Sequence, residues 1–147
     1  LAGSGPGAVQ PGQPSPAGPV VPSGRIGPAD LAAARAAWEA RGIDDYTWEV
    51  VFGCECLLNG STVVRVADGV PVEAANNGAP IAIADIEGFP LTVEAVFDEA
   101  RATLEGGGSV SASWDATGLP REMALDRVPE AVDDELGITV RSFTPAE

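Results

Sequence analysis

The stretch "DYTWEVVFGCEC", residues 45–56, decides the fold of this chain. Within it, apolar or sulfur-containing side chains recur at every second position, and most positions between them are polar or small. A period of two is the pattern of a β-strand that packs one face on a core and leaves the other face accessible. The stretch therefore predicts the principal strand of a sheet. The residues expected on its core face are Tyr46, Trp48, Val50, Phe52, Cys54 and Cys56.

Two other segments predict helices. Residues 28–41 form the first, because Pro28 suits a first turn and Gly42 is a natural stop. The second begins at Thr92, a good N-cap, and ends at Gly106. Apolar residues recur every three or four positions in both, which predicts one buried stripe on each helix. The expected stripes are Leu31, Ala34 and Trp38 in the first helix, and Val93, Val96, Phe97, Ala100 and Leu104 in the second.

The remaining periodic segments predict strands. "TVVRVADGVPVEA", residues 62–74, predicts a hairpin turning at Asp68 and Gly69, and Pro71 predicts an edge or an interruption in its second strand. "NNGAP", residues 76–80, predicts a loop, whereas residues 81–86 fit either a short strand or an extended segment. Further strands, without a crossover helix, are expected near 109–114, 121–128 and 138–143. Because strands joined by short links are antiparallel, the predicted class is α+β, a single antiparallel β-sheet with two helices packed on one face.

The first residues differ in composition from the rest. Residues 1–27 consist largely of Gly, Pro, Ser and Ala, with no charge before Arg25 and no aromatic side chain. Such a segment lacks the apolar surface that would offset the entropy of ordering it, so we expect a flexible, partly polyproline-II tether. Residues 28–147 are then one α+β domain, long enough for a single modest core.

The charge of the chain is lopsided. It has 22 acidic residues, 8 basic residues and a net charge of −14, and every basic residue is an arginine. Nucleic acids and anionic membrane surfaces require cations on the protein, so neither is an expected partner. The acidity favours solubility and also attracts divalent cations or a basic partner. No apolar run approaches the roughly 20 residues that cross a bilayer.

The first four residues, "LAGS", are similar to the end of a bacterial lipoprotein signal, Leu-Ala-Gly followed by the cysteine that is lipidated. Ser4 stands at this lipidation-equivalent position and cannot itself carry a thioether-linked lipid. The alternative is a chance match within low-complexity sequence. We therefore expect the lipid anchor in a parent protein, whose domain touches the membrane only through that anchor.

Several motifs in a fixed order carry a family resemblance. They are the Cys-x-Cys strand, "VRVADG" at 64–69, "FPLTVEAVF" at 89–97, and "SVSASWDATGLPREMALDRVPEAVDDELGITV" at 109–140. Over residues 34–143 the chain resembles an uncharacterised family of small bacterial envelope lipoprotein domains. Trp114 stands where that family often has Tyr, and "ATGLP" where it often has a second Tyr. The resemblance implies an extracytoplasmic location at the cell envelope and a fold pattern, but no activity.

Cys54 and Cys56 admit four interpretations. With no histidine and no third cysteine, the chain cannot complete a structural zinc site by itself. A redox pair of the Cys-x-x-Cys type has a longer spacing and lies at a helix N-terminus. An oxidising compartment favours a disulfide, although two residues along a strand span about 6.6 Å between Cα atoms, near the geometric limit. A bend at Gly53 would shorten that gap; two reduced core thiols remain the alternative.

An acidic tract late in the chain is the other candidate site. Asp126, Asp133, Asp134 and Glu135, with Glu130 between them, provide oxygen ligands of the kind that calcium prefers. Their spacing is not that of an EF-hand loop, so a solvated loop protecting a strand edge is the competing interpretation. Asp115, which precedes a turn with Gly118, is expected to bond to its own backbone.

These observations favour a non-catalytic protein. The chain has neither the histidine of a catalytic triad nor the lysine of a phosphate loop, and no cofactor is implied. We expect an envelope-anchored domain, a monomer, that binds an unknown envelope or secreted protein. The alternatives are a calcium-binding module that uses the acidic tract and, as a minor one, a thiol–disulfide protein.

Overall fold

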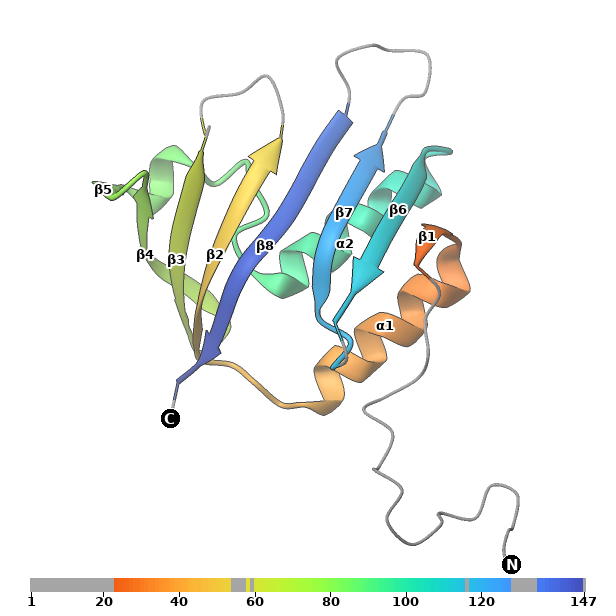
Figure 1. The fold of residues 1–147 in the computed structure, drawn as a ribbon, viewed down its shortest axis with the longest axis horizontal. Coiled ribbons are helices and arrows are strands. Elements are labelled where there is room, and N and C mark those ends of the chain that lie inside the picture. The colour runs from red at the N-terminus through yellow and green to blue at the C-terminus, as the bar shows by residue number, and fades with distance from the viewer. Residues whose placement is uncertain (1–22, 54–57, 59, 116, 128–134, 147) are drawn as a thin grey trace, which may run out of the picture.

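The fold is a single twisted β-sheet with helices on one of its faces (Figure 1). The computed structural model describes residues 23–53, 58, 60–115, 117–127 and 135–146. The sheet has eight strands in the order β1-β6-β7-β8-β2-β3-β4-β5, and all neighbours are antiparallel. The strands are β1 (Gly24–Ile26), β2 (Tyr46–Gly53), β3 (Ser61–Ala67), β4 (Val70–Asn76), β5 (Ala79–Ile81), β6 (Ser109–Trp114), β7 (Pro120–Asp126) and β8 (Glu135–Pro145).

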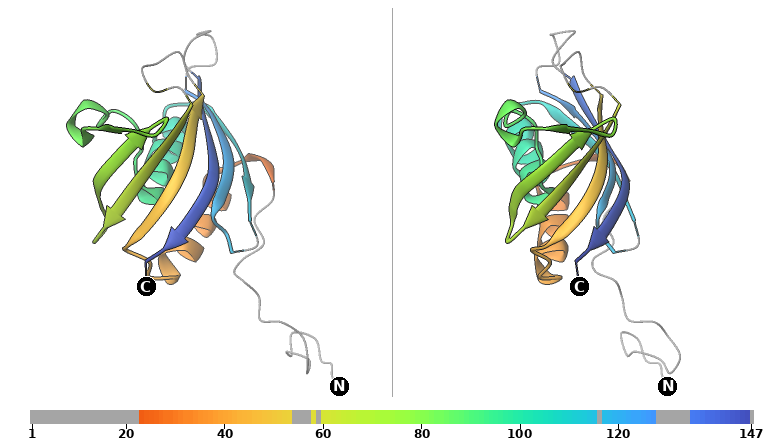
Figure 2. Two further views of the ribbon diagram at one scale, coloured as in Figure 1. Left: turned by 60° about the vertical axis from the view of Figure 1, so that its left-hand side comes forward. Right: turned by 90° about the vertical axis from the view of Figure 1, so that its left-hand side faces the viewer.

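Helices α1 (Pro28–Ala40) and α2 (Val93–Glu105) lie side by side on the same face of the sheet, and the short 3-10 helix η1 (Ile83–Asp85) follows β5 (Figure 2). This arrangement confirms the predicted α+β class. The opposite face of the sheet carries no helix in the part of the chain that the structure describes. In those ranges, no helix combines the length and the apolarity that crossing a membrane requires.

The strand predicted first, β2, is a central strand between β8 and β3. Tyr46, Trp48, Val50 and Phe52 are all at most 3% exposed, whereas the residues between them are half-buried or exposed. The period of two therefore sorts the strand into a core face under the helices and an uncovered face, as expected from the sequence. Cys54 and Cys56 lie outside the described residues.

The helix ends follow the capping chemistry in the sequence. Thr92 Oγ1 accepts a hydrogen bond from the Ala95 amide at 3.0 Å, and Asp30 Oδ2 accepts one from the Gly27 amide at 3.1 Å. Gly42 follows α1 with a positive φ of 63°. The predicted stripes are buried except at the end of α2, where Leu104 is half-buried and Thr103 takes its place in the core.

Two segments differ from the sequence-based expectation. Asn77 and Gly78 form a two-residue turn with φ values of 51° and 85°, so that residues 76–80 are a hairpin between β4 and β5 and not a loop. The Asn-Gly pair is typical of such a turn, but Pro80 argued against a strand after it, because proline is uncommon within strands. In addition, Gly24–Ile26 near the end of the expected tether forms β1, because β6 provides a ladder for it and Ile26 is buried in the core.

Candidate functional site

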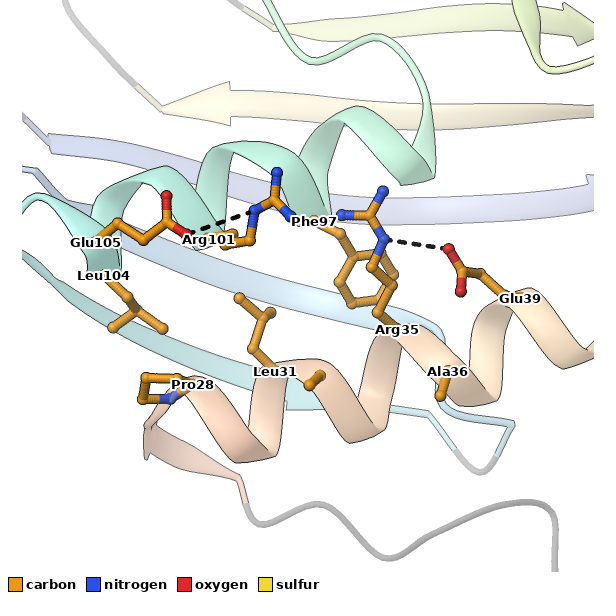
Figure 3. A pocket seen from close by; sticks show the side chains of 10 residues that line it. Pro28, Leu31, Arg35, Ala36, Glu39, Phe97, Arg101, Leu104 and Glu105 are labelled. Carbon is orange, nitrogen blue, oxygen red and sulfur yellow. Dashed lines mark hydrogen bonds and ion pairs between the residues drawn. The ribbon is translucent and has the colours of Figure 1, made fainter.

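A groove of about 530 Å³ runs between α1 and α2 on the covered side of the molecule (Figure 3). Its floor includes Leu31 and Phe97, which are 4% and 0% exposed and therefore belong to the core. Arg35 bridges the helices through Asp98, with Nη1 and Oδ1 2.7 Å apart. The rim residues are Pro28, Ala32, Ala36, Glu39, Arg101, Leu104 and Glu105.

The charges around this groove are matched within the protein. Arg35 also pairs with Glu39 at 3.3 Å, and Arg101 lies 3.9 Å from Glu105. A charged ligand would have to displace these ion pairs, and the large apolar side chains beneath them are already buried by the fold. The groove is therefore accounted for as the packing seam of two helices.

A polar network fastens α2 to the sheet beneath this seam. Trp38 Nε1 donates to Glu94 Oε2 at 2.7 Å, and the Tyr46 hydroxyl donates to Glu94 Oε1 at 3.4 Å. The same hydroxyl accepts a hydrogen bond from the Val93 amide at 2.9 Å, and Trp48 Nε1 donates to the Leu91 carbonyl at 3.0 Å. These bonds satisfy donors at the first turn of α2 and tie it to β2 and α1.

Burial raises the pKa of the Tyr46 phenol well above its usual value, and the nearby Glu94 carboxylate adds to this increase. Tyr46 is therefore a neutral hydroxyl at physiological pH and is unsuited to acid–base exchange. The polar groups of this network form hydrogen bonds with one another and hold the elements together.

The uncovered face of the sheet presents the other half of each strand. By register, it carries Thr47, Glu49 and Val51 on β2, with Val63 and Arg65 beside them on β3. On the opposite half, a row of small residues crosses β6, β7 and β8 at Ser111, Ala124 and Gly137. A shallow hollow of about 380 Å³ opens there, and a second of about 500 Å³ opens over β3 and β4. The first is lined by, among others, Ser111, Ser113, Glu122, Ala124, Gly137 and Thr139.

Three large apolar side chains are exposed on the β3–β4 hairpin. Val63, Val70 and Val72 are 40%, 57% and 42% exposed, and no other large apolar side chain in the described ranges is classed with them. Val63 and Val72 line the 500 Å³ hollow together with Ala75 and Pro80. We call these three residues the valine patch. Val70 lies apart from the hollow, at the turn end of the hairpin opposite Ala67. Exposed apolar side chains beside a hollow are a candidate interaction surface.

The edge beside the valine patch is closed to strand addition. Asp68 and Gly69 have φ values of 55° and 77° and form a two-residue turn closed by the Ala67–Val70 pair. Backbone groups alternate in direction along a strand, so the backbone of Pro71 faces away from β3, toward the open edge. Proline has no N–H, so this position lacks the donor that an added strand would need. Pro80 occupies the equivalent place on β5, one residue after the Asn76–Ala79 pair. This edge therefore offers few backbone donors for the addition of another strand.

Acidic groups gather at the turn end of the hairpin. Asp45 Oδ1 accepts a hydrogen bond from the Asp68 amide at 2.7 Å, and the Asp44 carbonyl accepts one from the Gly69 amide at 2.9 Å. These bonds hold three exposed aspartates, Asp44, Asp45 and Asp68, next to Val70. Arg65, the arginine of the hairpin, is already bonded to Glu73 at 2.8 Å.

The structure brings together part of the predicted acidic site. Asp126 and Glu135 are direct cross-strand partners on β7 and β8, while Glu130, Asp133 and Asp134 lie outside the described residues. Asp126 Oδ1 is buried without a hydrogen-bond partner among the described atoms. Within the same ranges, no three His, Cys, Asp or Glu side chains are placed to share a metal ion.

The other predicted positions are less informative about function. Cys54, Cys56 and Ser4 lie outside the described residues, so the disulfide and the anchor stay predictions. Asp115 is confirmed as a turn residue, because its Oδ1 accepts hydrogen bonds from the Thr117 and Leu119 amides at 2.8 and 3.1 Å.

The sequence analysis missed the valine patch. Its signal is the run Thr62-Val63-Val64-Arg65-Val66, in which an apolar residue interrupts the face that should be polar. Val72, next to Pro71, interrupts β4 in the same way.

A model of a family of unknown function, DUF6174, matches residues 30–145 of this chain, and the chain belongs to that family. No curated protein and no solved structure matches it. The match confirms the expectation of an uncharacterised domain, and it leaves the envelope location and the lipoprotein motifs as predictions.

Proposed function

Starting from membership of this family, we propose that the chain is a non-catalytic interaction module that binds a protein partner on the uncovered face of its sheet. The observation that carries the proposal is the valine patch, three exposed apolar side chains of one hairpin, two of which, Val63 and Val72, line a hollow of about 500 Å³. Antiparallel sheets leave one face to water when that face is polar. An apolar cluster on such a face instead favours a second protein, because contact with a partner removes it from water.

The polar chemistry of the molecule supports the same proposal. The chain contains no histidine and no lysine, the residue types that most often serve as catalytic bases or phosphate ligands. The single tyrosine and the carboxylate of Glu94 are engaged in fastening α2 to the sheet. The groups that remain accessible on the uncovered face include hydroxyls, carboxylates, aliphatic side chains and the guanidinium of Arg65, which is paired with Glu73, and such groups suit recognition.

A site-specific photo-cross-linker tests the proposal in the native envelope. We would place it at Thr139, which is exposed on the uncovered face, and at Ala36 on the covered side as the matched control. One defined adduct from Thr139, reduced when Val63 and Val72 are changed to Thr, is the expected result. Adducts of equal yield from Ala36, or none from either position in repeated preparations, would argue against an interaction face.

We further propose that the parent protein is a lipoprotein that stands at the bacterial cell envelope. Support comes from the "LAGS" sequence with Ser4 at the lipidation-equivalent position, and from the Pro- and Gly-rich residues that follow. The parent reading frame is expected to encode a basic, apolar leader that ends at Gly3, and a cysteine in place of Ser4. A natively encoded serine without any leader would refute this part of the proposal.

Calcium binding is the second candidate function. It is favoured by the facing carboxylates of Asp126 and Glu135 and by the buried, unpartnered Oδ1 of Asp126. Isothermal calorimetry should then show heat with calcium, and the heat should disappear in the Asp126→Asn variant. Absence of heat at millimolar calcium would leave the acidic tract as a solvated loop.

A further inference from the structure

We propose that the partner docks on the face of the β3–β4 hairpin with an apolar side chain in the hollow beside the valine patch and with Lys or Arg side chains against Asp44, Asp45 and Asp68. This inference rests on the proposed interaction function and names the surface and the chemistry of the partner. Two sets of contacts, one apolar and one electrostatic, carry it.

The apolar half is shaped for a side chain. The hollow of about 500 Å³ lies between the β3–β4 surface and the end of β5; Val63, Val72, Ala75 and Pro80 contribute apolar lining, and the ion pair of Arg65 with Glu73 also borders it. A volume of this size is within the roughly 300–1,000 Å³ that accommodates a ligand or an anchor residue. An aliphatic or aromatic side chain is the chemistry that fills such a site, and anchors of this kind dominate interface energies.

The electrostatic half lies at one end of the same hairpin. Asp44, Asp45 and Asp68 are exposed, and hydrogen bonds to the turn hold them together. Val70 follows Asp68 by two residues, so one exposed valine lies at the acidic end of the hairpin, and Val63 and Val72 at the hollow lie further along the same strands. The one arginine of the hairpin, Arg65, is bonded to Glu73 and does not neutralise these aspartates. Together with the net charge of −14, this complementarity selects a basic partner.

Other occupants fit less well. A second copy would bring together two chains that each carry a net charge of −14, so it would be repelled and would offer the aspartates no excess of cations. Strand addition at the neighbouring edge would meet Pro71 and Pro80, which lack the N–H groups that a ladder uses. The chain's own residues 1–22 contain no basic side chain to face the aspartates.

Nuclear magnetic resonance titration with defined peptides separates the two halves. The probes are acetyl-Leu-Gly-Arg-Arg-amide, acetyl-Gly-Gly-Arg-Arg-amide without the anchor, and acetyl-Leu-Gly-Glu-Glu-amide with reversed charge. We expect the first to shift amide signals of β3 and β4 and to bind about fivefold more tightly than the second, since one aliphatic side chain is partly buried. The third should cause no shift in this region.

Matched variants identify the site. Changing Val63 and Val72 to Thr should abolish the preference for the leucine peptide, whereas Val51→Thr, the same change elsewhere on the uncovered face, should retain it. The combined changes Asp44→Asn, Asp45→Asn and Asp68→Asn should weaken binding of both arginine peptides, because three carboxylates are lost. The control removes the same charge on the helix side through Glu39→Gln, Asp98→Asn and Glu105→Gln. An equal loss in this control would show non-specific attraction and overturn the inference.

Further outcomes would also overturn it. Concentration-dependent dimerisation that buries the valine patch would assign the surface to a second copy. Signals of residues 1–22 that move when Val72 is changed would assign it to the chain's own N-terminal segment. If no peptide binds while the cross-link from Thr139 persists, the basic-partner inference fails and the interaction function stands. If both are absent, the interaction function itself fails.

Discussion

The covered and uncovered faces of the sheet are built from the same strands, and neighbouring residues on β3 show how differently they are used. Val64 points under the helices and is 0% exposed, whereas Val63, its neighbour, is 40% exposed on the other face. The covered face is closed by packing and by bonds within the protein. The uncovered face holds apolar and acidic groups that the fold itself does not require, which is the reason for assigning recognition to it.

The comparison predicts that stability resides on the covered side. Phe97 is 0% exposed and stacks on Trp114 with ring centroids 6.3 Å apart. Phe97→Ala should lower the free energy of unfolding by about 3–5 kcal/mol, because a large buried side chain is lost and a cavity remains. Urea denaturation measures this change. A loss below about 1 kcal/mol would mean that the helices contribute less to the core than their burial indicates.

The polar network should contribute less than the aromatic core but more than any exposed contact. Tyr46→Phe leaves the Val93 amide without its buried partner, so we expect a loss of about 1–3 kcal/mol in unfolding free energy. As a control, Thr144→Ser alters a polar residue of the exposed end of β8 and should change stability by under about 0.5 kcal/mol.

The same tyrosine predicts a loss of stability in alkali. Burial raises the pKa of Tyr46, so its neutral form is favoured in the folded state. Its contribution is complete below the unfolded pKa of about 10 and is lost as the pH rises above that value, where the unfolded chain releases the proton first. Because the chain has one tyrosine, the increase in absorbance at 295 nm when tyrosinate forms reports this group, over a background from the three tryptophans. Tyr46→Phe should flatten the decline in urea midpoint between pH 9 and 11; an equally steep decline would assign the effect to other groups.

The same substitution, Val to Thr, can be made on each face of β3, at Val64 on the covered face and at Val63 on the uncovered face. Val64→Thr places a hydroxyl in the core and should cost about 1–2 kcal/mol, whereas Val63→Thr should change stability by under about 0.5 kcal/mol. Both variants keep a β-branched side chain on the same strand, so strand propensity is matched. Thermal and urea unfolding of the pair decide the matter. Similar losses in both would mean that Val63 is part of the core.

The covered face is the part of this architecture that the sequence predicts best. Alternation in residues 46–52 and the stripes of the two helices predict the covered face, because burial imposes a regular period on the side chains that pack there. The order of the last three strands also follows, since short links force antiparallel pairing. β5 was missed because Pro80 opposes a strand assignment, although its missing N–H turns outward at an edge.

The candidate site was harder to predict than the fold. The residues of the valine patch follow no hydrophobic period, because core packing does not select them. Val72 also lies at a bulge of β4, since the pairing register between β3 and β4 shifts between Arg65 and Val66. The cysteines were singled out by residue type, spacing and the period of two, and the acidic tract by residue type, and none of these signals gives the positions of the side chains in space. Of the tract, only Asp126 and Glu135 fall within the described residues, and their pairing required the β7–β8 register.

The smallest predicted effect concerns glycines on the uncovered face. Gly137 pairs with Gly53 on one side and Ala124 on the other, and Ser111 continues this row of small side chains. A Cβ built on Gly137 would meet no atom closer than 3.6 Å, and its φ is not in the left-handed region, so the fold does not demand glycine here.

Gly137→Ala should therefore raise the free energy of unfolding by about 0.5–1 kcal/mol, because alanine has less freedom to lose in a strand. Gly108→Ala is the contrasting control, since its Cβ would collide with the Asp126 carbonyl oxygen, and it should destabilise. Urea denaturation of both variants shows whether each change raises or lowers the free energy of unfolding.

The cross-link from Thr139 then tests whether this glycine also serves binding. If Gly137→Ala raises stability and also lowers the cross-link yield, the bare backbone is part of the interaction face, since glycine in a strand marks a place where another chain approaches closely. A gain in stability with an unchanged cross-link would confine the interaction to the β3–β4 side, and a loss of stability would show that the glycine serves the fold.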